Sequence, residues 1–388
     1  MTSPLIALDL FAGSGWGVAC HALGIEEHGV ELMAEAVATR EAAGFSTIFR
    51  DVWDGLLNET FLSEAALDVL ADYDLLIASP PCQTFSAAGK GAGRKALDDV
   101  LAAIRDGSFK TPHLLHSLTR TLDPRTALVL APLAYIWRDR PRFVALEQVP
   151  SVLPVWEAYA EVMRDLGYSV AVGVLNAEQH GVPQTRKRAI LTARLDDDVA
   201  VLPAPTHSRY YSRDPERLDE DVLPWVSMAE ALGWPPSDLV GFPRRSDGRA
   251  AVVIDGEAYR ARDLRAASDP AQTVTEKARS WQRFTARKNM GRGMVERHGP
   301  RPGRPANTPA FAIRAAAGGT EPGGFIFEAP DGSTRKLEPS EAAVLQTYPA
   351  DFPFRGSQTA RFLQIGNAVP PLLASSILST FLDRKGVT

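Results

Sequence analysis

The sequence predicts an α/β protein with a doubly wound, mostly parallel sheet and a smaller irregular domain. Short apolar runs alternate with amphipathic helical segments over the first 200 residues, and unbroken apolar runs are typical of parallel strands covered on both faces. From about Pro203 to Arg335 the chain is instead rich in Pro, Gly and Arg and has few long periodic runs. We therefore expect a first domain over 1–200, a second over 201–335, and a C-terminal segment, 336–388, that returns to the first.

The expected strands of the first domain are short apolar runs. They include Leu5–Leu10, Asp74–Ala78, Arg142–Leu146, Ser169–Leu175 and Ala189–Ala193, and a second and a third strand are expected to end near Glu31 and Asp51. Val155–Leu166 has the spacing of an amphipathic helix. Helical periodicity returns after Arg335 in SEAAVLQTY, and Phe362–Leu382 is expected to form a helix entered through a Gly-Asn-Ala-Val-Pro-Pro turn.

The composition is that of an ordinary soluble globular protein, with 45% hydrophobic and 23% charged residues. The N-terminus has no basic leader, and no stretch stays apolar for long enough to span a membrane. Two cysteines far apart in sequence, Cys20 and Cys82, indicate neither a disulfide framework nor a zinc cluster. We expect a cytoplasmic protein without a metal site.

The distribution of charge matters more than the net charge of −5. Residues 244–314 contain 16 Lys/Arg and 7 Asp/Glu, a net charge of +9, so the rest of the chain carries −14. A basic segment in an acidic body is the electrostatic pattern of a phosphate-binding surface. On charge alone, an Arg-rich solvated surface is an equally good interpretation.

The first chemical motif is DLFAGSGWG, residues 9–17, at the end of the first expected strand. Closely spaced glycines let the backbone approach a ligand, and the following helix points its N-terminus toward it. Glu31 stands near the end of the second expected strand, where an acidic side chain can hold ribose hydroxyls. Asp51 lies at the corresponding position, at the end of the third expected strand. The pattern predicts a nucleotide-type site.

The second motif, SPPCQTFSAAGKGAG, follows the strand Asp74–Ala78 directly. Two prolines fix the backbone before Cys82, and glycines follow it. A cysteine at the end of a strand, with a rigid entry and a Gly-rich exit, is well placed for nucleophilic attack. A buried structural cysteine is the usual alternative, and the flanking Pro-Pro and Gln-Thr-Phe-Ser argue against it.

Two further motifs follow the next strands. Glu147 directly follows the expected strand Arg142–Leu146. The segment HGVPQTRKRAIL places Gln184, Arg186 and Arg188 at alternate positions. Side chains two apart on a strand face the same side, so we expect both guanidiniums to grip one ligand. A solvated basic edge strand is the interpretation if no active site lies beside it.

In order, these motifs resemble those of the bacterial and phage DNA cytosine-C5 methyltransferase family. The resemblance covers roughly 1–195 and 335–388 and leaves the middle as the variable recognition region. It implies the fold of the methyltransferases that use S-adenosylmethionine. The matching segments are DLFAGSG, Glu31, Asp51, PPCQTFS, EQV, QTRKR, RKLEPSEAAVLQTYP and QIGNAVPP.

The resemblance also implies roles for individual residues. Cys82 would be the nucleophile that attacks C6 of a flipped-out cytosine, Glu147 the acid at the base, and Arg186 and Arg188 the clamps. The residues implied in S-adenosylmethionine binding are Phe11, Gly13, Gly15, Glu31, Asp51, Pro80 and Asn367. Ser86 is also expected to contact DNA, and the charge excess of the middle region predicts phosphate contacts from Arg279, Arg283, Arg287 and Lys288.

One motif departs from the family pattern, because Gln148 stands where the family has Asn after the catalytic Glu. The longer amide must make its hydrogen bonds from a slightly different place, so we expect altered local geometry with the reaction retained. Cys20, beside the Gly-rich turn, is expected to be dispensable.

Three alternatives stay open on the sequence. A tRNA cytosine-C5 methyltransferase has the same catalytic residues, although the long insert favours duplex DNA. A second alternative transfers a modified group from an altered cofactor, against which Asn367 argues. A third is a catalytically inactive DNA-binding relative, against which Cys82, Glu147 and both arginines argue. We expect a monomer whose partner is double-stranded DNA, and the sequence decides neither the target site nor whether a cognate restriction endonuclease exists.

Overall fold

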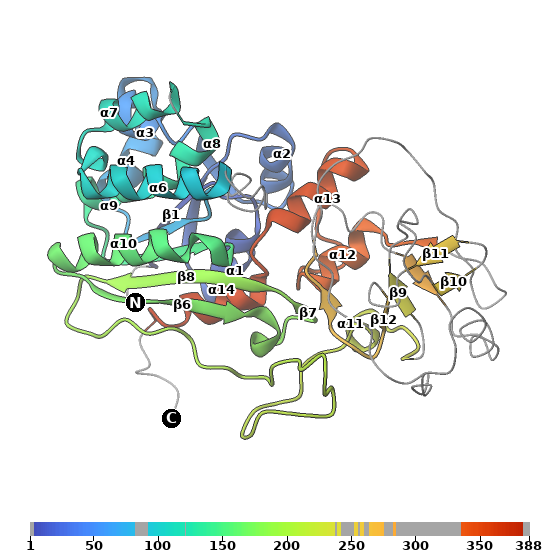
Figure 1. Ribbon diagram of the computed structural model, residues 1–388. Coiled ribbons are helices and arrows are strands. Elements are labelled where there is room, and N and C mark those ends of the chain that lie inside the picture. Colours follow the sequence, from blue (N-terminus) through green and yellow to red (C-terminus); the bar gives the residue numbers. More distant parts are fainter. Residues whose placement is uncertain are drawn as a thin grey trace.

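The computed structural model describes residues 4–81, 92–120, 122–236, 239–241, 252–254, 257–259, 264–274, 282–284 and 335–382 (Figure 1). Its main sheet has the strand order β3-β2-β1-β4-β5-β8-β6. Neighbouring strands from β3 to β5 are parallel, and β8 is antiparallel to both β5 and β6. The predicted doubly wound, mostly parallel sheet is confirmed. Its strands are β1 (Ile6–Leu10), β2 (Glu26–Val30), β3 (Ser46–Phe49), β4 (Leu75–Ala78), β5 (Phe143–Gln148), β6 (Ser169–Asn176) and β8 (Lys187–Arg194).

Helices cover both faces of this sheet (Figure 1). The α-helices are α1 (Gly15–Leu23), α2 (Ala34–Ala42), α3 (Asp54–Leu57), α4 (Glu64–Asp72), α6 (Ala92–Arg105), α7 (Pro112–Ser117), α8 (Pro124–Ala127), α9 (Ala131–Asp139), α10 (Leu153–Asp165), α11 (Met228–Leu232), α12 (Pro339–Leu345), α13 (Gln358–Asn367) and α14 (Pro371–Leu378). Short 3-10 turns are η1 (Glu59–Phe61), η2 (Ser108–Lys110), η3 (Leu118–Arg120), η4 (Leu128–Leu130), η5 (Pro150–Val152) and η6 (Ala177–His180). Within the described part of the chain, no helix combines the length and apolar character needed to cross a membrane.

The alternation of side chains along β1 divides the core between the two faces. Leu8 and Leu10 pack into the larger cluster, to which α4, α6, α9 and α10 contribute. Ala7 packs on the opposite face, in the cluster that includes α1 and α14. Asp9 shares the face of Ala7 and is fully buried. The last described helix of the chain therefore covers the same side of the sheet as the first.

A third apolar cluster lies beside the main sheet and joins distant parts of the chain. It contains residues of α11, of the stretch 267–274, and of α12 and α13. The C-terminal segment is thus divided, because α12 and α13 share a core with residues 228–274 while α14 packs against α1. The domain boundary predicted at 335/336 stays a prediction. The small strands here are β7 (Gln184–Thr185), β9 (Leu239–Gly241), β10 (Val252–Ile254), β11 (Glu257–Tyr259), β12 (Leu264–Ala266), β13 (Ala271–Gln272), β14 (Gln282–Phe284) and β15 (Arg335–Lys336).

The expected elements agree with the structure except near the C-terminus. The helix expected over Val155–Leu166 is α10, and the strand expected over Ala189–Ala193 lies inside β8. The expectation of one helix over Phe362–Leu382 is wrong, because α13 ends at Asn367 and α14 begins at Pro371. Pro370 and Pro371 cannot donate the backbone hydrogen bonds of a continuous helix.

Glu178, in the turn η6 before β7, is a buried carboxyl group. Its side chain is 2% exposed, and its Oε2 accepts the backbone N–H of Arg186 at 3.3 Å. Burial is the main cause that raises the pKa of Glu178 to about 7. The folded chain therefore retains this proton to a higher pH than the unfolded chain does.

Replacing Glu178 with Gln should make the protein more stable at alkaline pH. The unfolded carboxyl loses its proton near pH 4.5 and the folded one near pH 7, so the wild-type free energy of unfolding falls as pH rises between these values. Relative to wild type, Glu178→Gln should gain about 2 to 3 kcal/mol between pH 5 and pH 8. Denaturant unfolding of both proteins at each pH measures this gain. A difference that does not change with pH would contradict the assignment.

Candidate active site

The carboxyl ends of three neighbouring parallel strands bring the predicted motifs to one edge of the sheet. The Gly-rich turn follows β1, Ser79 and Pro80 follow β4, and Glu147 and Gln148 end β5. In open α/β sheets, ligands bind at this edge. Cys82 lies outside the described residues, two positions after Pro80 in the chain.

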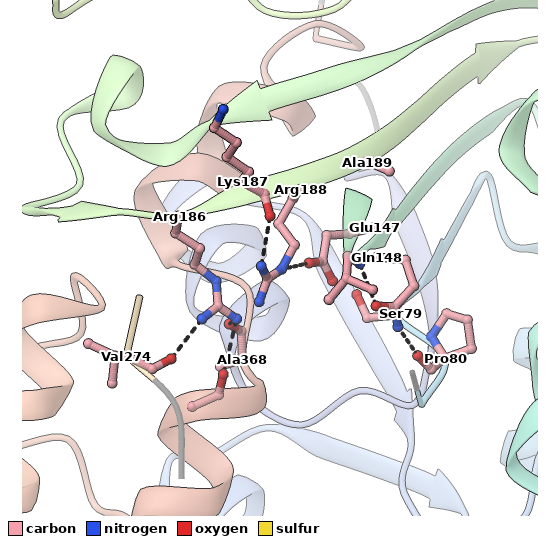
Figure 2. Close-up of polar contacts among 12 residues, drawn as sticks. Ser79, Pro80, Glu147, Gln148, Arg186, Lys187, Arg188, Ala189, Val274 and Ala368 are labelled. Atoms are coloured by element: carbon pink, nitrogen blue, oxygen red, sulfur yellow. Dashed lines mark hydrogen bonds and ion pairs between the residues drawn. The ribbon is translucent and has the colours of Figure 1, made fainter. Parts of the chain in front are cut away.

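Glu147 forms an ion pair with Arg188 (Figure 2). Arg188 Nε lies 2.5 Å from Glu147 Oε1, and the two side chains are 12% and 4% exposed. The antiparallel pairing of β5 with β8 places Glu147 opposite Ile190, so Arg188 is near on the adjacent strand. Because both side chains are largely shielded from water, this charge-assisted hydrogen bond fixes the orientation of the Glu147 carboxylate.

Arg186 is also buried but has different partners (Figure 2). Its Nη1 donates to the Val274 carbonyl at 2.9 Å, and its Nη2 donates to the carbonyls of Gly366 and Ala368 at 3.0 and 2.8 Å. Arg188 reaches the glutamate, whereas Arg186, between β7 and β8, contacts residues on both sides of Asn367. The expectation that both guanidiniums grip one ligand stays a prediction. The role of Arg186 as a clamp on the substrate stays a prediction.

Gln148 connects the end of β5 to the segment that precedes Cys82. Its Nε2 donates to the Pro80 carbonyl, and its Oε1 accepts the N–H of Val149 (Figure 2). The side chain is buried, so both groups of the amide are paired within the protein. The contact ties the end of β5 to the segment before Cys82, and a role of Gln148 in positioning Glu147 stays a prediction.

The turn after β1 has the backbone geometry of a ligand cradle. Phe11 and Gly13 have φ of 62° and 50°, the left-handed region. Glu31 Oε2 accepts the N–H of Gly13 at 2.9 Å, and its Oε1 accepts the N–H of Met33 at 2.8 Å. A Cβ placed on Gly13 would meet nothing within 4 Å among the described residues, so this side of the turn is open.

The other predicted cofactor residues lie around the same edge. Gly15 begins α1, Asp51 follows β3 and accepts the N–H of Trp53 at 3.0 Å, and Asn367 is exposed at the end of α13. Ser14 and Tyr348 join the Gly-rich turn to the C-terminal segment through a hydroxyl contact of 3.0 Å. Residues from both ends of the chain thus surround the turn, and their part in cofactor binding stays a prediction.

Most of the predicted DNA-binding residues cannot be placed. Ser86, Arg279, Arg287 and Lys288 lie outside the described residues, and of Arg283 only the backbone in β14 is described. Cys20 is buried in α1, and burial raises the pKa of its thiol. Among the residues that the structure describes, no group of three His, Cys, Asp or Glu is placed to hold a metal ion.

Sequence reasoning missed a buried amide pair beside Arg186. Gln184 Nε2 donates to Gln346 Oε1 at 2.6 Å and to the Leu345 carbonyl at 2.8 Å, and its Oε1 accepts the N–H of Val274 at 2.8 Å. Gln346 Nε2 in turn donates to the Ile365 carbonyl at 2.6 Å. The position of Gln346 inside the motif LQTYP is the only signal that could have pointed to it.

Comparisons with curated proteins agree with this geometry. The chain matches the family described as C-5 cytosine-specific DNA methylase over residues 6–105 and 115–382. It is 27% identical over 380 residues to the type II methyltransferase M.AplI of Arthrospira platensis, covering 97% of this chain and 85% of that protein. It is 29% identical over 399 residues to the type II methyltransferase M.XorII of Xanthomonas oryzae pv. oryzae, covering 97% and 84%.

Solved structures show the same fold at lower identity. The Entamoeba histolytica methyltransferase EhMeth has a TM-score of 0.53 and 12% identity, over 98% of both chains. A putative DNA modification methyltransferase encoded within an E. coli prophage has a TM-score of 0.52 and 18% identity, over 97% of this chain and 98% of that one. The family match extends over nearly the whole chain, in the order of motifs that surround the Glu147–Arg188 pair. The chain therefore belongs to the C-5 cytosine-specific DNA methylase family.

Proposed function

We propose that this protein transfers a methyl group from S-adenosylmethionine to C5 of a flipped-out cytosine in a specific sequence of double-stranded DNA. The observation that carries the proposal is the pairing of Glu147 with Arg188 at the sheet edge where Gln148 contacts Pro80. This edge holds a carboxyl group in fixed orientation next to the entry of the Cys82 segment. Membership of the family supports the same reaction.

The residues at the Gly-rich turn fit the proposed methyl donor. The open side of Gly13 leaves space for a ligand, and Phe11, Glu31 and Asp51 are each partly exposed around it. A partly exposed carboxylate such as that of Glu31 can accept hydrogen bonds from the hydroxyl groups of a ribose. An aromatic ring such as that of Phe11 can pack against a base. Pro80 and Asn367 would complete the pocket from β4 and α13. When bound, S-adenosylmethionine supplies an electrophilic methyl group on a sulfonium.

The reaction requires the ring of cytosine to be activated, because C5 is a poor nucleophile. The Cys82 thiolate forms a bond to C6, and the displaced electron pair moves into the ring and makes C5 enamine-like. In this step the protonated form of Glu147 donates its proton, or a hydrogen bond from it, to N3, where negative charge develops. Arg188 keeps the Glu147 carboxyl in this orientation and pairs with the carboxylate that remains after the proton has moved. After C5 has taken the methyl group, it loses its proton to a base, and the thiolate leaves C6 to restore the ring.

The target base must leave the DNA stack before Cys82 can reach C6, because C6 is covered in a duplex. The long insert with its basic segment 244–314 favours duplex DNA as the substrate, since its positive charge attracts phosphates. We assign base recognition to residues 201–335. The curated relatives are type II methyltransferases, and we propose the same restriction–modification role here, for a monomer in the cytoplasm.

Expression in a host without cytosine methylation tests the activity and the nucleophile together. The wild type should place 5-methylcytosine at one recurring sequence of the host genome, while Cys82→Ala should place none and still bind DNA. Duplexes that contain 5-fluorocytosine at this site should form an adduct that resists denaturation with the wild type alone, because fluorine at C5 blocks the release of the thiol. Turnover by the wild type without this adduct would remove Cys82 from its role. Cys20→Ala is the matched control and should retain activity.

Gln148→Asn should retain activity within about tenfold, a barrier change near 1.4 kcal/mol. The shorter amide can still contact Pro80 after a small shift, whereas Gln148→Leu loses the contact and should be slower. Glu147→Gln should cost much more than Gln148→Asn, because it removes the proton donor at N3. Steady-state kinetics of the three variants measure the order. If Gln148→Asn is as damaging as Glu147→Gln, the positioning role of Gln148 is wrong.

A graft of residues 201–335 into a related methyltransferase of known target should transfer the target sequence. Genome-wide mapping of 5-methylcytosine after expression of the chimaera gives the answer. Loss of an Arg that reads a guanine edge should cost about 1 to 3 kcal/mol on the target, whereas loss of a phosphate contact should weaken binding to every sequence alike. An active chimaera that keeps the target of the host enzyme would show that recognition lies elsewhere.

A further inference from the structure

A cationic side chain lies fully buried behind the Gly-rich turn. Arg40, in α2, donates from Nε to Thr47 Oγ1 at 3.0 Å and from Nη1 to the Gly13 carbonyl at 3.2 Å. Its Nη2 donates to both carboxylate oxygens of Glu27, at 2.8 and 2.9 Å, and to the Ser46 carbonyl. Each guanidinium nitrogen therefore has an acceptor. The planar, rigid group has one position that satisfies all of them.

The sequence leaves room for this guanidinium at Gly29. A Cβ placed on Gly29 would lie 2.2 Å from Arg40 Nη2, closer than any side chain allows. Gly29 pairs with Asp9 in the sheet, and Ala7 pairs with Glu27, so both acidic side chains share the face on which Arg40 lies. The two carboxyl groups and the missing side chain at Gly29 thus form the pocket for Arg40.

The charges in this pocket balance when Asp9 is neutral. Neither carboxyl oxygen of Asp9 has a hydrogen-bond donor among the described residues. Burial, followed by the nearby Glu27 carboxylate, holds the pKa of Asp9 well above its usual range. Glu27 is then the counterion of Arg40, at side-chain exposures of 4% and 0%. The remaining guanidinium N–H groups are available to neutral acceptors, and one of these is the Gly13 carbonyl.

Gly13 is consequently held from both sides. Its N–H donates to Glu31, and its carbonyl accepts from Arg40. A glycine at φ 50° has no side chain to restrict its peptide groups, so these two contacts fix the orientation of the peptide groups on either side of Gly13. The open side of Gly13 is the side proposed for the methyl donor.

We propose that Arg40 is a positioning residue for the methyl-donor site, which it shapes by holding the Gly13 carbonyl from behind. The inference rests on the proposed function, because it takes the open side of Gly13 as the cofactor cradle. Arg40 would act on the affinity for the donor and not on the methyl-transfer step, since it touches neither DNA nor any residue proposed to react.

The test separates positioning from fold stability through two variants. Arg40→Lys keeps a cation beside Glu27, but one ammonium does not reproduce the fixed geometry that reaches Glu27, Thr47 and Gly13 together. Glu27→Leu/Arg40→Met replaces the buried ion pair with apolar side chains, a change that is often neutral or stabilising. Thr47→Val is the control, because it removes one partner of Arg40 and leaves the contact with Gly13.

Calorimetric titration with S-adenosylhomocysteine measures donor-site affinity without turnover. We expect both variants to bind it roughly tenfold or more weakly than wild type, and Thr47→Val to bind it within about threefold. In steady-state kinetics, the KM of both Arg40 variants for S-adenosylmethionine should rise by a similar factor. Their kcat at saturating donor and their KM for DNA should stay within about threefold of the wild-type values. The melting temperature of the double variant should stay near that of wild type.

Three outcomes would overturn the inference, and they are distinguishable. If wild type binds S-adenosylhomocysteine and either Arg40 variant binds it equally tightly, the inference fails alone. If wild type does not bind it at all, the cofactor assignment fails, and the inference fails with it. An effect on kcat alone, with an unchanged KM for the donor, would also overturn it.

Discussion

Glu147 and Arg188 form their ion pair where the sheet changes direction, between parallel β5 and antiparallel β8. Both charges are largely removed from water, and a buried charge is tolerated only with a well-placed partner. The pair therefore depends on the register of β5 against β8. A slip of one residue would turn Arg188 to the other face of the sheet and leave Glu147 without its partner. The orientation of the proposed catalytic carboxyl follows from this register.

Contacts from Gln184 and Arg186 connect the proposed site at the sheet edge with distant parts of the chain. Gln184 accepts the N–H of Val274, and Arg186 donates to the carbonyl of the same residue. The same two side chains donate to carbonyls of residues 345, 366 and 368. Val274 and the segment around Asn367 are thus both held by residues that lie close to Arg188 in the chain. Residues 184–186 therefore connect part of the proposed recognition region with the proposed donor site and the proposed catalytic carboxyl.

Several polar groups at this edge are held by specific partners beside the apolar core of the sheet. Gln148 pairs with Pro80 and Val149, Glu31 with Gly13 and Met33, and Arg40 with Glu27 and Gly13. Most of these partners are backbone groups, which do not depend on the side chain at that position. Burial of a carboxyl group also makes stability depend on pH. In Glu178, burial raises the pKa to about 7, so the free energy of unfolding falls as the pH rises toward that value.

Local patterns in the sequence determined the fold class and the content of the site. Unbroken apolar runs such as those of β1, β4 and β5 predicted a parallel sheet, because only strands buried on both faces need such runs. Residues at the ends of these strands predicted the site, because parallel strands end at a common edge. The motif also indicated that the amide of Gln148 would make its hydrogen bonds from a different place than the usual Asn, and the structure shows these bonds to Pro80 and Val149.

Only the tertiary structure decided which residues meet across long separations. Alternation along QTRKR predicted that Arg186 and Arg188 face one side, but their partners come from residues 274, 366 and 368 for one and from Glu147 for the other. Likewise, nothing in the spacing of Glu27 and Arg40 indicates a buried ion pair, because it forms only after β1, β2, β3 and α2 have packed around Gly29. Sequence periodicity specifies which face a side chain occupies. The partner on that face is set by the packing of elements that are distant in the chain.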